Sequence, residues 1–234
     1  DIDLLTDPRD LPIAAKLLSD GGYALQLPRR LAHFESWHAG SKESVWSRGG
    51  SLHVELHTRL ADNRRLIPDV DVHSARQHIE VAPSHSLPTL AEDELFAYVA
   101  VHGASSAWFR LKWISDFAAL LHARSGADID RLYRRSQELG AGRSAGQALL
   151  LADTLFGVLR PIPELGVELG SDRATRLLCR AALRMMSGGS REPTERPLGT
   201  LAIHWTQFLL QPGLDFKISE LWRQGGSLVS RLRH

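Results

Sequence analysis

The spacing of apolar residues changes near Thr89, and this change constrains the fold more than any other feature of the sequence. Before Thr89, short segments alternate apolar and polar residues, as half-buried strands do. The clearest is SLHVELHTRL at residues 51–60, where Leu52, Val54 and Leu56 alternate with polar residues. After Thr89, apolar residues recur every three or four positions, as on one face of a helix. The sequence therefore predicts an α+β protein, in which a small mixed-sheet domain at residues 1–85 is followed by an all-α domain at residues 86–234.

The first domain is expected to contain short strands around one clear helix. Apolar residues follow helical spacing from Asp10, a capping residue, to the pair Gly21 and Gly22, where the helix should end. Strands are expected at residues 1–5, 23–27 and 76–82, and strand-like pieces lie between Phe34 and Leu60, of which residues 51–60 are the clearest. Pro83 and Pro88 predict a linker between the two domains.

The second domain reads as a succession of helices. The first begins at a capping threonine, Thr89, and has an acidic first turn. At residues 128–130 the sequence DID precedes another helix, where Asp128 is expected to be the cap. Helices are expected at residues 89–104, 107–126, 128–140, 143–157, 171–189, 198–210 and 215–224.

Composition excludes several classes of protein. The formal net charge of the 234 residues is +1, which argues against a dedicated nucleic-acid surface. The single cysteine, Cys179, excludes an intrachain disulfide and a cysteine zinc cluster, and it fits a reducing cytoplasm. No apolar run approaches the roughly 20 residues that a membrane span requires. We therefore expect a cytoplasmic protein that does not enter a membrane.

Carboxylates open the chain at Asp1 and Asp3. On a strand both would point to one face, where two like charges repel unless a cation compensates for them. A divalent metal ion is the common compensating cation. Glu55 also stands between two apolar residues of a predicted strand. Carboxylates from neighbouring strands that hold two metal ions form the usual site for nucleotidyl transfer, and Mg²⁺ or Mn²⁺ suits such oxygen ligands.

Two other interpretations of these residues stay open. The first strand could simply end in solvent, with no role for its aspartates. His53, Glu55 and His57 also share one strand face and could bind iron or zinc. Positions i, i+2 and i+4 spread over about 13 Å of strand, so that all three cannot meet at one ion. Two of them together with an outside ligand could.

Four segments together resemble the uncharacterised nucleotidyltransferase-like family of the DNA polymerase β-type nucleotidyltransferase superfamily. They are DIDLL at 1–5, DPRDLPIAAKLL at 7–18, HVELH at 53–57 and VHGASSAWFRLKWISDFAALL at 101–121. The last is the most specific, because its His-Gly pair is followed by Trp, Arg-Leu-Lys-Trp and Asp. The resemblance spans roughly residues 1–160. It implies a catalytic core with a small mixed sheet, which transfers a nucleoside monophosphate from a nucleoside triphosphate such as ATP.

The resemblance also implies roles for three acidic residues. Asp1 and Asp3 match the paired metal-binding aspartates of the superfamily, and Glu55 matches the third carboxylate. These three residues are the expected catalytic and metal-binding residues. Glu55 is also a candidate general base for the acceptor hydroxyl.

Candidate contacts to the nucleotide lie in the last matching segment. His102 could contact the nucleotide, and the alternative for it is a packing histidine. Arg110 and Lys112 could each clamp the triphosphate, although residues two apart on a helix do not share a face. The alternative for both is a solvated cation. Asp116 is expected to be a buried partner of one of them.

The expected partners are a nucleoside triphosphate and an unknown acceptor. The near-neutral charge favours a small molecule, a peptide or a protein over a nucleic acid as the acceptor. The nucleotide is expected to lie between the two domains. The superfamily holds the triphosphate with a Gly-Ser or Gly-Gly turn about ten residues before the aspartates, so we expect a segment to be missing before Asp1. The alternative is a catalytically inactive nucleotidyltransferase-like module that binds a nucleotide or a protein.

Overall fold

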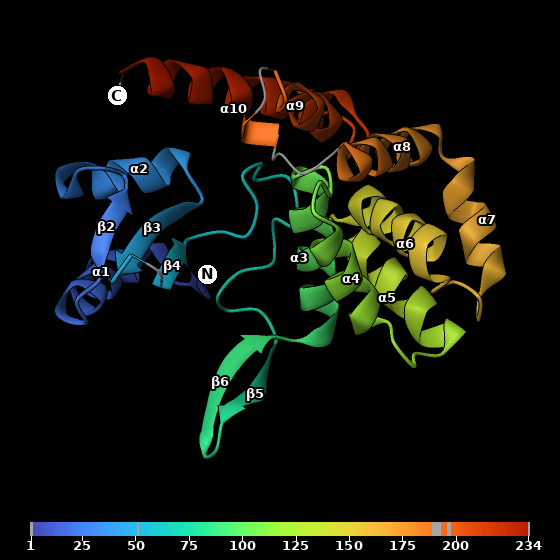
Figure 1. Ribbon diagram of the computed structural model, residues 1–234, viewed down its shortest axis with the longest axis horizontal. Coiled ribbons are helices and arrows are strands. Elements are labelled where there is room, and N and C mark those ends of the chain that lie inside the picture. Colours follow the sequence, from blue (N-terminus) through green and yellow to red (C-terminus); the bar gives the residue numbers. More distant parts are fainter. Residues whose placement is uncertain (1, 51, 189–192, 196–197, 234) are drawn as a thin grey trace.

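The computed structural model describes residues 2–50, 52–188, 193–195 and 198–233 (Figure 1). A four-stranded mixed sheet with two helices precedes a region built mainly of helices. The predicted α+β class is confirmed. Asp1, the first of the expected metal ligands, lies outside the described residues.

The sheet has the strand order β1-β4-β3-β2. Strand β1 runs parallel to β4, and the other neighbouring pairs are antiparallel. The strands predicted at 23–27 and 51–60 are present with shifted ends, and β1 lies within the strand predicted at 1–5. The elements of this part are β1 (Ile2–Leu5), η1 (Pro8–Asp10), α1 (Leu11–Asp20), β2 (Ala24–Leu27), η2 (Leu31–His33), α2 (Phe34–Gly40), β3 (Glu43–Arg48) and β4 (Leu52–His57).

One face of the sheet packs against helices α1 and α2. In β4, Val54 and Leu56 are buried on this face. Because successive side chains of a strand alternate between faces, Glu55 and His57 lie on the opposite face. The core on the helix-covered face consists of Leu11, Ala15, Phe34, Trp46, Val54 and Leu56.

A β-hairpin follows the sheet and projects away from both parts of the molecule (Figure 1). It consists of β5 (Arg76–Ala82) and β6 (His85–Leu90), which pair antiparallel. The linker predicted between Pro83 and Pro88 is wrong, because this stretch is the turn and second strand of the hairpin. Pro88 fits there because a strand with an open edge tolerates a residue that cannot donate a hydrogen bond.

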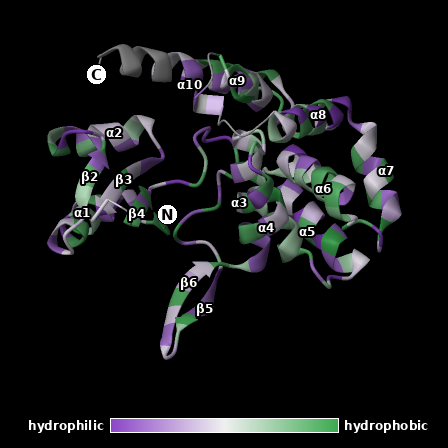
Figure 2. Cartoon of the chain, viewed as in Figure 1, coloured by the Kyte–Doolittle hydropathy of each residue, from purple (hydrophilic) through white to green (hydrophobic). Residues whose placement is uncertain are grey.

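Helix α6 lies at the centre of the helical region and packs against α3, α5 and α8. Hydrophobic and hydrophilic residues are interspersed along helices such as α5 and α8 (Figure 2), and the buried residues of α5 recur at helical spacing. Their bounds are α3 (Glu92–Ser105), α4 (Leu111–Leu120), α5 (Gly126–Glu138), α6 (Gly142–Phe156), α7 (Pro163–Ser171), α8 (Arg173–Ser187), η3 (Pro193–Glu195), α9 (Leu201–Gln207) and α10 (Leu214–Arg233). Within the described residues, no helix has the length and apolar character needed to cross a membrane.

Three local predictions in this region are corrected. The N-cap of the first helix, α3, is Ala91 rather than Thr89, which lies in β6. The helix expected from residue 107 begins at Leu111, because Ala107 and Trp108 both have a φ of 51° and form a turn instead. The cap of α5 is Ser125 rather than Asp128. The Asp128 carboxylate instead accepts a hydrogen bond from the Ser125 backbone N–H, so that the two residues form a capping box.

The segment between β4 and β5 ties the sheet to the helical region. Leu60, Ile67 and Val70 are buried in one cluster with Ala97 and Val101 of α3. This packing holds α3 on the side of the sheet that α1 and α2 do not cover. The amide of Asn63 in the same segment also donates a hydrogen bond to Glu220 of α10, at 2.8 Å.

Candidate active site

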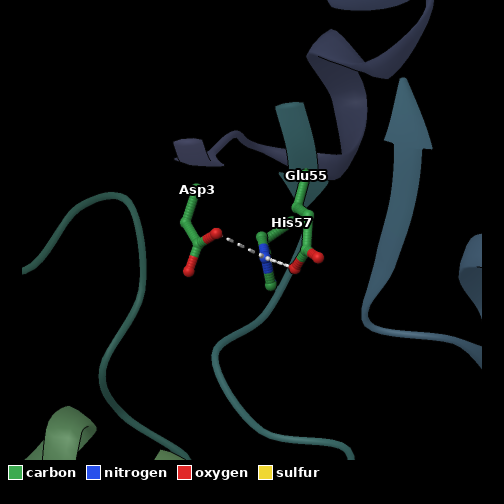
Figure 3. A group of neighbouring side chains, drawn as sticks. All are labelled: Asp3, Glu55 and His57. Carbon is green, nitrogen blue, oxygen red and sulfur yellow. Dashed lines mark ion pairs between the residues drawn. The ribbon is translucent and has the colours of Figure 1, made fainter. Parts of the chain in front are cut away.

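Asp3, Glu55 and His57 meet on the sheet face that turns towards α3. Each offers one ligand atom, and these atoms lie within 4.8 Å of one another (Figure 3). The parallel register of β1 and β4 places Asp3 directly opposite Glu55. His57 follows two positions later on the same face of β4.

The three side chains differ in exposure. The exposed fraction is 42% for Asp3, 26% for Glu55 and 2% for His57. The Nε2 atom of His57 lies 3.4 Å from Glu55 Oε2 and 3.9 Å from Asp3 Oδ1. Neither nitrogen of the His57 ring has a hydrogen-bond partner among the described residues. A buried polar group without a partner is costly and requires an explanation.

A divalent metal ion would satisfy this donor set. Two carboxylates and one imidazole are ordinary ligands of such ions. An ion at Nε2 would supply the partner that this nitrogen lacks, and it would offset the repulsion between Asp3 and Glu55. The residues present therefore fit a metal ion.

The sequence anticipated only part of this group. It proposed Asp3 and Glu55, which the structure brings together, and it placed His57 only in the alternative iron or zinc site. The usable signal was the alternation in LHVELH, which puts Glu55 and His57 on one face. Asp3 occupies the place of the outside ligand that this alternative required. His53, the third residue of that alternative, is exposed and lies outside the group.

Helix α3 contributes a tyrosine to the site. The Tyr98 hydroxyl donates a hydrogen bond to Asp3 Oδ2, at 3.3 Å. Burial and the Asp3 carboxylate raise the pKa of Tyr98 well above its ordinary value, so the hydroxyl keeps its proton at neutral pH. Tyr98 was not anticipated, because a tyrosine in an amphipathic helix carries no distinguishing pattern.

His102 lies one helical turn after Tyr98, and the two ring centres are 5.9 Å apart. Burial lowers the pKa of His102, and Lys42 adds to this effect. His102 therefore lies near the group formed by Asp3, Glu55 and His57, and its ring is neutral at neutral pH.

The start of β3 and the residue before it add a charged pair that the sequence did not single out. Lys42 pairs with Glu43, and Glu43 stands directly opposite His57 in the β3–β4 ladder. The distance from Glu43 Oε2 to His57 Nδ1 is 3.7 Å. No local pattern could have identified Glu43, because only the strand register brings it to His57.

The pKa of Glu55 is held below its ordinary value. The nearby His57 ring is the main cause, and Lys42 and His102 contribute. Partial burial raises the pKa of Glu55, but this effect is smaller than the lowering by its neighbours. Glu55 is therefore ionised at neutral pH, which is the form that binds a cation.

Arg110 and Lys112 lie at the start of α4. The Arg110 guanidinium carbon lies 5.3 Å from the centre of the Trp113 ring, which in turn contacts His102 edge-on at 5.6 Å. Lys112 is exposed, and so is Asp116. The expectation that Asp116 would be a buried ion-pair partner is therefore wrong.

A separate cavity of about 520 Å³ lies between the start of α1 and the end of α2. None of the three metal-ligand candidates lines it. Its wall includes His38, a buried ring whose Nδ1 lies 3.4 Å from Thr58 Oγ1. Burial lowers the pKa of His38 to about 4, and Arg59 and His57 contribute.

A comparison with protein families gives one match. The model of a family described as uncharacterised nucleotidyltransferase matches residues 1–157, which include all three metal-ligand candidates and His102. No curated protein and no solved structure matches the chain. Since the family model covers more than half of the sequence, the chain belongs to this family of uncharacterised nucleotidyltransferases.

Proposed function

We propose that this protein is a metal-dependent nucleotidyltransferase, which moves a nucleoside monophosphate from a nucleoside triphosphate to an acceptor hydroxyl. The observation that carries the proposal is the convergence of Asp3 and Glu55 on the buried ring of His57, neither of whose nitrogens makes a hydrogen bond with the described residues. Membership in a nucleotidyltransferase family supports the same reaction class.

Asp3, Glu55 and His57 would hold the metal ion, which we propose to be Mg²⁺ or Mn²⁺. Asp1, which lies outside the described residues, is proposed as a further ligand because it precedes Asp3 by two positions in the sequence. When bound, the ion neutralises phosphate charge and lowers the pKa of the attacking hydroxyl.

The other residues of the site bind and orient the reactants. Tyr98 holds the Asp3 carboxylate through its hydrogen bond. His102 is proposed to contact the nucleotide, since it lies beside the metal-ligand group. Arg110 and Lys112 are proposed to contact the triphosphate, with Arg110 favoured because its guanidinium lies over the Trp113 ring that borders His102.

In the proposed reaction, the acceptor oxygen bonds to the α-phosphorus and the bond to pyrophosphate breaks. Glu55 is the candidate acceptor of the hydroxyl proton. We assign catalysis to residues 1–85 and substrate positioning to residues 86–234, with the nucleotide between them. The net charge of +1 favours a small molecule, a peptide or a protein as the acceptor.

Calorimetric titration with a non-hydrolysable nucleoside triphosphate tests the proposal, with and without Mg²⁺ or Mn²⁺. Wild type is expected to bind in a metal-dependent manner, and Glu55→Gln should weaken binding by about tenfold or more, the effect of about 1.4 kcal/mol. Glu80→Gln is the matched control, because Glu80 is an exposed strand glutamate of the hairpin. Metal-independent binding, or an equal loss in both variants, would contradict the proposal.

The inactive-module alternative is tested separately. A nucleotide-binding module would bind the triphosphate analogue but release no pyrophosphate from the natural triphosphate with any acceptor hydroxyl. Metal-dependent pyrophosphate release that Asp3→Asn abolishes would exclude that alternative. Release that persists in Asp3→Asn would remove Asp3 from the mechanism.

A further inference from the structure

His57 has carboxylates on both sides of its ring. Its Nε2 atom faces Glu55 and Asp3, at 3.4 and 3.9 Å. Its Nδ1 atom faces Glu43 Oε2, at 3.7 Å. Glu43 reaches this position because it pairs with His57 across the antiparallel β3–β4 ladder.

The immediate surroundings favour a defined role for Glu43. Its exposed side-chain fraction is 24%, and that of its partner Lys42 is 16%, so that both charges are largely buried. The Oε2 atom of Glu43 is itself buried, and Lys42 balances its charge. A buried carboxylate held against one nitrogen of a buried ring can determine which nitrogen carries the proton.

A histidine that binds a metal ion usually donates its other N–H to a carboxylate or a carbonyl, which fixes both the tautomer and the ring orientation. We propose that Glu43 is the positioning residue of this site, accepting the Nδ1–H of His57 so that the Nε2 lone pair faces the ion. The proposal rests on the metal site of the proposed function. The 3.7 Å separation exceeds a hydrogen bond and is expected to shorten when Nε2 is bound.

A different role for His57 fits the same distances. A protonated ring could bridge the carboxylates as a cation, with no metal ion involved. In that case Glu43 would act only through its charge, and the effect of removing it would not depend on a metal bond at Nε2. The two roles therefore give different results in a double-mutant cycle.

The experiment uses the full chain and Mn²⁺ alone, with affinity measured by calorimetry. Glu43→Gln is expected to weaken Mn²⁺ binding by about 10- to 100-fold, the usual effect of losing such a partner. In a His57→Ala background, Glu43→Gln should cause no further loss. Glu35→Gln is the matched control, because it removes an exposed glutamate of α2 and should leave the affinity unchanged. An equal loss from Glu43→Gln with and without His57 would overturn the proposal.

A spectroscopic readout tests the ligand directly. With Cu²⁺ as the probe, the electron paramagnetic resonance spectrum of wild type should show coupling to one nitrogen. His57→Ala should remove this coupling, whereas Glu43→Gln should keep it at a lower affinity. Retained nitrogen coupling in His57→Ala would overturn the assignment of His57 as the ligand that Glu43 positions.

The failure of this inference can be told apart from the failure of the proposed function. If wild type binds no Mn²⁺, the metal site itself is wrong. If wild type binds Mn²⁺ and Glu43→Gln binds it equally well, only the role of Glu43 is wrong. Should Glu43→Gln not fold because Lys42 is left unpaired, Glu43→Asp keeps the charge but withdraws it from His57. Glu43→Asp is then expected to weaken Mn²⁺ binding, and an unchanged affinity in this variant would overturn the proposal.

Discussion

Asp3 and Glu55 stand directly opposite each other in the parallel strands β1 and β4, on the sheet face that α1 and α2 leave uncovered. Two carboxylates in this position repel each other. Tyr98 donates a hydrogen bond to one carboxylate, and the His57 ring lies beside the other. The site is therefore arranged so that a bound cation relieves an existing electrostatic cost.

Metal binding should raise the thermal stability of the protein. A metal ion at a free concentration of about 100 times its Kd stabilises the folded state by about 2.7 kcal/mol. For a chain of this size that corresponds to a rise in Tm of roughly 5–10 °C. Asp3→Asn should abolish most of the rise, whereas Glu80→Gln should retain it. Scanning calorimetry with Mn²⁺ and with a chelator measures the difference, and an equal rise in Asp3→Asn would exclude Asp3 as a ligand.

The imidazole in the donor set should influence which metal ion binds. Nitrogen ligands favour transition metals, whereas Mg²⁺ prefers oxygen ligands. We expect Mn²⁺ to bind more tightly than Mg²⁺, and His57→Asp to reduce that preference. His53→Asp is the control, since His53 is an exposed residue of the same strand. Competition titrations of the two ions test this, and an unchanged preference in His57→Asp would argue against a bond to the ring.

His38 should make stability fall in mild acid. Its pKa is about 4 in the folded protein, below the ordinary histidine value of about 6.5. Between these values the unfolded chain binds a proton that the folded chain does not, so the free energy of unfolding decreases as pH falls. This loss should amount to about 2 kcal/mol at about pH 5.

Urea unfolding at about pH 7.5 and about pH 5 measures this loss. His38→Gln should lose correspondingly less stability between the two pH values than wild type does. His53→Gln is the matched control, because His53 is exposed. Parallel pH profiles for wild type and His38→Gln would show that His38 is not the responsible group.

Gly103 should not tolerate a side chain. A Cβ at this position would lie 2.4 Å from the Trp108 ring, which is fully buried. Gly103→Ala is therefore expected to cost about 1–3 kcal/mol through overpacking. Gly170→Ala is the control, because no described atom lies within 4 Å of its Cβ position, and alanine there should be neutral or stabilising by up to about 1 kcal/mol. Chemical denaturation compares the two, and equal stabilities would contradict the packing argument.

Local periodicity determined the fold class and identified Glu55 and His57 as residues of one strand face. The alternation at residues 52–57 identified β4 and placed Glu55 and His57 on one face, because a strand repeats every two residues. Most helices after residue 91 followed from their spacing in the same way, but α7 (Pro163–Ser171) was not predicted. The prediction at residues 83–88 failed because proline ends most strands but is tolerated at an open edge.

Only the tertiary structure decided which residues meet His57. The pairing of β1 with β4 brings Asp3 to it, and the β3–β4 register brings Glu43 to the other side of its ring. Tyr98 reaches Asp3 because buried residues after β4 hold α3 against this face of the sheet. Strand order, register and the docking of a helix depend on contacts between residues far apart in the chain. Neither local propensity nor local spacing contains that information, because both describe neighbours in sequence rather than neighbours in space.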